Sequence, residues 1–167
     1  MTISLDDQAL QSLITALPGQ IARARRSAIG TTVTYARQRL QAQMIARTGL
    51  PARVFRRVRI KTRRRPESGT VWLGYNPVKA AYVGRVKQDP QGAFAGDYFF
   101  PDSFVVRMQS GHVGIFKRGG QSRLGLVEQT VDLSAGPAVA RSVAADAGRE
   151  LRARLADRLR QLNPALS

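Results

Sequence analysis

The only histidine of the chain, His112, lies in the glycine-rich sequence Ser-Gly-His-Val-Gly. Such a histidine could act as a general base, but a base needs an orienting partner, and the nearest acidic residues, Asp102 and Glu128, are each about a strand away. A zinc site would need two or three more nitrogen or sulfur ligands, and the chain has no other histidine and no cysteine. The segment therefore predicts a structural turn between two strands, made of Ser110, Gly111, His112 and Gly114.

A second glycine-rich segment follows, Lys117-Arg118-Gly119-Gly120, but it lacks the spacing and the Lys-Ser/Thr ending of a phosphate-binding loop. It predicts a basic hairpin tip, with Lys117 and Arg118 as candidates for contact with a partner. No G-x-S-x-G nucleophile motif occurs, and no cluster of carboxylates offers a magnesium site. We expect no catalytic residue, cofactor or metal ion, and hence a protein that is not an enzyme.

Positive charge dominates the composition, with 27 Lys and Arg against 11 Asp and Glu and a formal net charge of +16. No acidic residue occurs between Gln8 and Pro66, a span that holds fourteen basic ones. Uncompensated charge of one sign repels itself and attracts polyanions, so we expect this region to meet a negatively charged partner. The candidates for that interface are Arg53, Arg56, Arg57, Arg59, Lys61, Arg63, Arg64 and Arg65.

The elements that position these residues begin with a basic helical region over residues 6–47. Asp6 or Asp7 can cap a first short helix, and Pro18-Gly19 predicts a kink or a break before a longer helix over 20–47. In that helix a single apolar stripe recurs at helical spacing. It consists of Ile29, Val33, Ala36, Leu40 and Met44, and Gly49 is the expected C-terminal cap.

A β-rich core is expected over residues 56–130. Val58 and Ile60 alternate with basic residues, as in a strand with one buried face. Further strands are predicted at 70–75, 82–87, 104–108, 113–118 and 124–129. The sequence QDPQGAFAGDYFFPDS between them is rich in Gly, Asp and Pro and predicts a loop. Its aromatic residues would pack on the core or form a subunit contact.

A long C-terminal helix is predicted over residues 135–162, with Pro137 in its first turn. Leu151, Leu155 and Leu159 lie on its apolar stripe and are expected to be buried in the core or in a subunit contact. Glu150 and Arg154 can pair at i, i+4. We expect an α+β fold in a single domain, with N-terminal helices, a central antiparallel or mixed sheet and the C-terminal helix packed on it.

Composition also bears on location. The longest apolar runs are far shorter than the ~20 residues of a membrane helix. The N-terminal sequence carries Asp6 and Asp7 where a signal peptide would carry positive charge. The chain is therefore expected to be soluble, made in a cytoplasm and without a membrane partner.

The sequence PDSFVVRMQSGHVGIFKR, from Pro101 to Arg118, resembles the signature of the bacteriophage minor tail protein Z family. That signature has a phenylalanine-led strand, a methionine, Ser-Gly-His, then Gly-x-Phe and a basic residue. The following QSRLGLVEQTVDLS resembles the family's arginine-leucine-proline-isoleucine segment, with Gly125 and Leu126 in place of the last two residues. The basic N-terminal helix and the arginine- and leucine-rich C-terminal helix are similar in layout.

The resemblance implies a structural virion protein that acts in tail completion and head–tail joining at the head-proximal end of the tail, made in the host cytoplasm. Its implied partners are the tail terminator, the tail tube and the connector rings, in a homo-oligomeric ring, with non-specific contact to DNA passing through the tail left open. The alternative, which rests on the charge alone, is a stand-alone nucleic-acid-binding protein.

Overall fold

The computed structural model describes residues 7–56, 59–119 and 125–162, with side chains from Pro18 onward. Helices and antiparallel strands both occur, which confirms the predicted α+β class. The chain divides into two compact units, each assembled from separate stretches of sequence. Unit 1 comprises Met1–Leu40, Thr62–Trp72 and Arg141–Ser167, and unit 2 comprises Gln41–Lys61 and Leu73–Ala140.

The first helix, α1, runs without interruption over Asp7–Thr48. No break occurs at Pro18-Gly19, because Pro18 lies inside the helix. Proline has no N–H to donate to the carbonyl four residues earlier, but Pro18 is exposed, so water can bond that carbonyl instead. The predicted apolar stripe is buried along its whole length, from Ile29 to Met44. The helix ends as expected, since Gly49 adopts a left-handed φ of 66° and its N–H bonds the carbonyl of Ile45 at 2.8 Å.

The middle of α1 contains a β-branched run, Ile-Gly-Thr-Thr-Val-Thr, that has low helix propensity. Two of its threonines donate side-chain hydrogen bonds to the preceding turn, from Thr31 to the carbonyl of Ser27 at 3.0 Å and from Thr34 to that of Gly30 at 3.1 Å. Val33 is buried, whereas Arg39, on another face of the helix, is exposed. Burial of the apolar residues therefore outweighs the weak propensity of the run.

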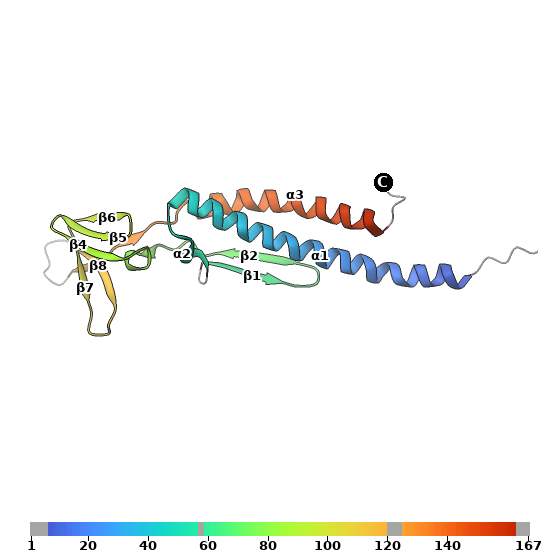
Figure 1. The fold of residues 1–167 in the computed structure, drawn as a ribbon, viewed down its shortest axis with the longest axis horizontal. Helices are drawn as coiled ribbons and strands as arrows, with labels where there is room; N and C mark the ends of the chain where they lie inside the picture. Colours follow the sequence, from blue (N-terminus) through green and yellow to red (C-terminus); the bar gives the residue numbers. More distant parts are fainter. Residues whose placement is uncertain (1–6, 57–58, 120–124, 163–167) are drawn as a thin grey trace, which may run out of the picture. The chain divides into compact units, whose positions relative to one another are not determined.

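In unit 1, α1 lies between two other elements (Figure 1). One is α3, which spans Gly136–Leu162 and lies with most of its length in this unit. The other is the hairpin of β1 (Ile60–Arg64) and β2 (Gly69–Leu73). The pair Glu150–Arg154 forms as predicted, at 2.7 Å. The predicted stripe of α3 is only half-buried at Leu151, Leu155 and Leu159, whereas Val143 is buried.

The β1–β2 hairpin contacts α1 through one of its two faces. A Cβ atom added at Gly69 would collide with the Cγ2 atom of Val33 and come within 3.1 Å of Ile29, so the strand approaches the helix at a residue without a side chain. Arg64 lies on the same face and donates a hydrogen bond to the hydroxyl of Thr34 at 2.8 Å. At the tip of the hairpin, the N–H of Arg65 bonds the carbonyl of Ser68 at 2.8 Å.

Unit 2 contains a three-stranded antiparallel sheet where the sequence predicted a loop. Its strands are β4 (Val86–Asp89), β5 (Gly92–Ala95) and β6 (Tyr98–Pro101). The loop prediction was wrong because Pro90-Gln91 and Gly96-Asp97 form two-residue hairpin turns, and the residues between them pair as strands. At the second turn Gly96 has a φ of 61°, which suits the residue type, and Ala95 pairs with Tyr98 on either side.

A second antiparallel sheet in unit 2 consists of β7 (Ser103–Arg107), β8 (Val113–Arg118) and β9 (Leu126–Glu128). The predicted strand at 124–129 corresponds to β9, with Leu124 outside the described residues. A further strand, β10 (Thr130–Val131), follows it and pairs with β3 (Val78–Lys79). The predicted strand at 82–87 is confined to β4, because residues Ala80–Tyr82 form a 3-10 turn, η1. A short helix, α2, spans Ala52–Arg56.

Gln88 connects the two three-stranded sheets of unit 2. From β4, its side-chain amide nitrogen donates to the carbonyl of Gly92 at 2.7 Å, within its own sheet. Its amide oxygen accepts the backbone N–H of Val105 on β7 at 2.8 Å. One side chain thus satisfies a backbone group at the edge of the neighbouring sheet.

Two glycines of unit 1 offer a matched test of the contact between the hairpin and α1. Gly69→Ala should lower the melting temperature, because the new methyl group collides with the stiff, buried side chain of Val33. Gly30→Ala should instead raise stability by up to about 1 kcal/mol, since no atom lies within 4 Å of the added Cβ and alanine favours the helix. Thermal unfolding followed by circular dichroism checks both, and equal effects of the two changes would contradict this packing.

Candidate functional site

The Ser-Gly-His segment lies in the tight turn between β7 and β8. The N–H of Met108 bonds the carbonyl of His112 at 2.8 Å, and the N–H of Gly111 bonds the carbonyl of Met108 at 2.9 Å. Gly111 has a φ of 81°, a left-handed conformation that glycine adopts without strain. Ser110 is exposed in the same turn. The backbone geometry of the turn is thus accounted for by local hydrogen bonds.

The side chain of His112 contacts Glu128, which is about a strand away in the sequence. Its Nε2 atom lies 2.9 Å from Oε1 of Glu128, because β9 pairs with β8 and brings Glu128 opposite Phe116. The other oxygen of the same carboxylate, Oε2, accepts a bond from Nζ of Lys79 at 2.7 Å. Sequence reasoning did not single out Lys79, and no motif marks it, because its position depends on the pairing of β3 with β10.

Glu128 and Lys79 shift each other's pKa values. Burial by itself would raise the pKa of Glu128, but hydrogen bonds from Lys79 and His112 and the charge of Lys79 hold that pKa below its ordinary value. The hydrogen bond to Glu128, followed by the charge of that carboxylate, raises the pKa of Lys79. A lysine with a raised pKa stays protonated at neutral pH, so Lys79 serves here as a charge partner for Glu128 and not as a nucleophile.

Gly114 leaves room for this cluster. A Cβ atom at Gly114 would lie 2.6 Å from the ring of Phe116 and 3.1 Å from Oε1 of Glu128. The carboxylate therefore occupies space beside the strand that any other residue at 114 would fill. Among the described residues, no three His, Asp or Glu side chains gather closely enough to hold a metal ion.

The structure separates the basic candidates according to whether their side chains bind elsewhere in the chain. Arg53 donates to the carbonyl of Val83 at 2.8 Å, and Arg59 donates to the carbonyls of Asn76 at 2.8 Å and Pro77 at 3.3 Å. These two guanidinium groups hold loops of unit 2 in place. Arg53, Arg59 and Arg64 stay candidates for the predicted interface, and each also has a partner within the chain, which for Arg64 is the hydroxyl of Thr34.

Two candidates at the predicted basic tip are also engaged. Lys117 pairs with Asp102 at 3.3 Å, and the guanidinium of Arg118 lies over the ring of Phe104, 5.8 Å from its centroid. Lys61 has an interaction within the chain, and Arg57 lies outside the described residues, as does Gly120. Of the predicted cations that the structure describes, the ones with no side-chain hydrogen bond or ion pair are Arg56, Arg63 and Arg65.

Arg63 and Arg65 lie together on the hairpin of unit 1. With Ser68 and Thr70 they line a pocket of about 210 Å³. No acidic residue lines it, and the nearest in sequence, Glu67, pairs with Arg25 on α1 at 2.7 Å. The site thus presents two guanidinium groups and two hydroxyl groups, all of them able to donate hydrogen bonds to an anion.

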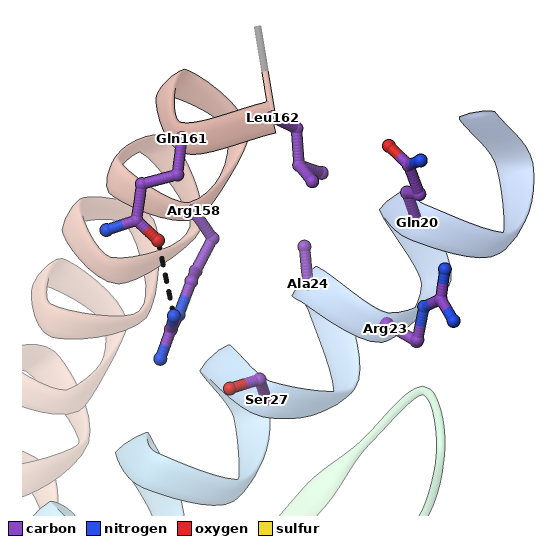
Figure 2. A pocket seen from close by; sticks show the side chains of 7 residues that line it. All are labelled: Gln20, Arg23, Ala24, Ser27, Arg158, Gln161 and Leu162. Atoms are coloured by element: carbon purple, nitrogen blue, oxygen red, sulfur yellow. Dashed lines mark hydrogen bonds between the residues drawn. The ribbon is translucent and has the colours of Figure 1, made fainter. Parts of the chain in front are cut away.

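A second, larger pocket of unit 1 lies between α1 and the C-terminal end of α3 and measures about 420 Å³ (Figure 2). Gln20, Arg23, Ala24 and Ser27 line it from α1, and Arg158, Gln161 and Leu162 line it from α3. Arg158 donates to the side-chain oxygen of Gln161 at 3.2 Å. This pocket also has two arginines, but Arg158 is already hydrogen-bonded to Gln161, and apolar and amide side chains line much of the rest.

Comparison of the chain with protein-family models, with curated proteins and with solved structures finds no match. The described helices include none that is long and apolar enough to cross a membrane.

Arg59 and Arg56 provide a matched test, because the side chain of Arg59 makes hydrogen bonds within the chain and that of Arg56 makes none. Arg59→Ala should lower the free energy of unfolding by about 1–2 kcal/mol, because two backbone carbonyls lose a charged donor. Arg56→Ala should change it by less than about 0.5 kcal/mol, since its exposed side chain makes no hydrogen bond. Urea titrations of both variants measure the difference, and a larger loss for Arg56→Ala would contradict the assignment.

The Glu128 cluster predicts a pH dependence of stability. Because the folded-state pKa of Glu128 is lowered, its contribution is present above the unfolded-state value near 4.3 and is lost as the pH falls through the folded-state pKa. The raised pKa of Lys79 adds a contribution that is lost only in strongly alkaline solution. Glu128→Gln should therefore flatten the acid side of the stability curve. Asp97→Asn, which neutralises an exposed carboxylate in a turn, is the matched control, and an equal effect of the two changes would contradict the role of the cluster.

Proposed function

We propose that the chain is a structural protein of a bacteriophage tail that acts in tail completion and head–tail joining. The observation that carries this proposal is the resemblance of residues 101–118 to the minor tail protein Z signature. Those residues make up β7, β8 and the turn between them, so the signature corresponds to one continuous hairpin. Its Ser-Gly-His part fits the requirements of that turn, with Gly111 at positive φ.

The chemistry of the described residues supports a binding role rather than catalysis. His112 and Glu128 are bound to each other and Glu128 also to Lys79, which leaves the carboxylate occupied on both oxygens. His112 therefore already has a partner within the chain, as an orienting or structural residue would. The proposed protein is accordingly not an enzyme.

Unit 2 carries exposed apolar side chains of the kind found at subunit contacts. Val127 is 55% exposed and Leu126 44% exposed on the edge strand β9, and Phe99 is 42% exposed on β6. Large apolar groups on an edge strand favour association with another chain. In the proposed virion such contacts would repeat around a homo-oligomeric ring that meets the tail terminator, tail tube or connector rings.

The large excess of basic side chains supports partners with negative charge. Arginine supplies most of it, and its planar fork bonds two oxygens of a carboxylate or phosphate at once. A chain with a net charge of +16 is more stable when acidic neighbours offset its own repulsion. The proposed location is the head-proximal end of the tail in the virion, with assembly in the host cytoplasm.

Deletion of the gene from its phage tests the proposed function directly. We expect the deletion to yield DNA-filled heads and tails that fail to join, and a plasmid copy of the gene to restore infectious particles. Immunogold labelling of the restored virions should mark the head-proximal end of the tail in electron micrographs. Normal joined particles from the deletion strain, or virions that carry no label, would overturn the proposal.

A further inference from the structure

We infer that the outer face of the β1–β2 hairpin binds the phosphate groups of a nucleic-acid backbone, through Arg63, Arg65, Ser68 and Thr70. This inference deepens the proposed function, on which it rests for the source of the DNA, namely the genome that passes the tail. The binding site itself follows from side chains of unit 1 alone.

The face of the hairpin follows from the alternation of side chains along a strand. Gly69 and Arg64 face α1, as their contacts with Val33 and Thr34 show. Their neighbours Arg63 and Thr70 therefore project from the opposite face, away from the helix. Arg65 follows the last residue of β1 and also lines a pocket beside Arg26 and Gly30 of α1. The pocket that Arg63 and Arg65 line with Ser68 and Thr70 is consistent with this placement.

The two arginines have no internal partner that would explain them. Within the described ranges neither makes a side-chain hydrogen bond or an ion pair, whereas Arg64 between them bonds Thr34 and Arg25 nearby bonds Glu67. Two adjacent guanidinium groups without a counter-charge repel each other. A bound oxyanion removes that repulsion and accepts the hydrogen bonds that both groups can donate.

The donor set favours phosphate over carboxylate. A single arginine fork already satisfies both oxygens of a carboxylate, whereas this site adds a second fork and two hydroxyl groups. Arginine, serine and threonine side chains are the groups that commonly contact backbone phosphates. Arg63 lies on β1 and Arg65 is the first residue after it, so in extended chain their Cα atoms are at most about 6.6 Å apart, a separation at which each can bind a different phosphate.

An aromatic side chain extends this face. Trp72 lies two residues beyond Thr70 along β2, hence on the same face by alternation, and it is 51% exposed. Exposed indole rings next to a row of cations are a common feature of surfaces that follow a nucleic-acid strand. No side chain here is positioned to read base edges in a groove, so the expected binding is weak and independent of sequence.

A salt series of DNA binding tests the inference. The probe is a fluorescein-labelled DNA duplex, and its anisotropy with the full chain is measured from roughly 50 to 200 mM salt. Arg63→Gln/Arg65→Gln should reduce the slope of log K against log salt by about 2 and weaken binding at low salt. The matched control is Arg141→Gln/Arg152→Gln, which removes two exposed cations of α3 that make no hydrogen bond, at the same cost in net charge.

Three outcomes decide the inference. A loss of slope confined to the hairpin variant, with unchanged melting temperatures, supports it. Equal losses in both variants overturn it, because the net charge alone would then account for binding. The third outcome comes from poly-glutamate added as a competitor. If poly-glutamate binds the wild type more tightly than DNA does, and no longer does so in the hairpin variant, the face binds acidic protein and the inference is wrong.

A further variant checks the hydroxyl groups without any change of charge. Ser68→Ala/Thr70→Ala should weaken DNA binding several-fold at every salt concentration and keep the wild-type slope, because no phosphate charge is left unneutralised. Unchanged affinity would remove the hydroxyls from the site. Failure here is distinguishable from failure of the proposed function: the anisotropy slopes judge the hairpin, whereas joined particles from the deletion strain judge the role in the tail.

Discussion

The burial of α1 on two sides is the constraint on which unit 1 depends. Its β-branched run and Pro18 both disfavour a helix, and no local feature compensates for them fully. Around the β-branched run the helix persists because α3 lies along one side and the β1–β2 hairpin along the other, as Figure 1 shows, whereas Pro18 is exposed. With one side of the hairpin committed to α1 at Gly69, its other side is left for the cations.

Arginines that look alike in the sequence have different roles because of what lies within reach of each. Arg53 and Arg59 end near backbone carbonyls that no strand partner occupies, so they act as internal donors. Arg63, on β1, and Arg65, just after it, lie beside residues that supply only hydroxyl groups. A run of positive charge thus divides into structural residues and available ones, according to which acceptor atoms lie within reach of each side chain.

Sequence patterns predicted the features that depend on local periodicity or on one residue type. The buried stripe of α1, the left-handed Gly49, the bounds of β8 and the Glu150–Arg154 pair all follow from spacing. The β4–β5–β6 sheet was missed, although Gly96-Asp97 is a hairpin signal, because aromatic and glycine residues together looked like a loop. The meeting of Lys79 with Glu128 was not predictable, since it needs β3 to find β10 some fifty residues later.

Gln88 has a consequence for how unit 2 opens. A sheet normally loses its edge amides first, because water competes for N–H groups that no strand covers. Here the N–H of Val105 is bound by the side chain of a neighbouring sheet, and that side chain is bound in turn to Gly92. Exposing the Val105 amide to solvent exchange therefore requires the link between the sheets to break, which joins them into one cooperative unit of unfolding.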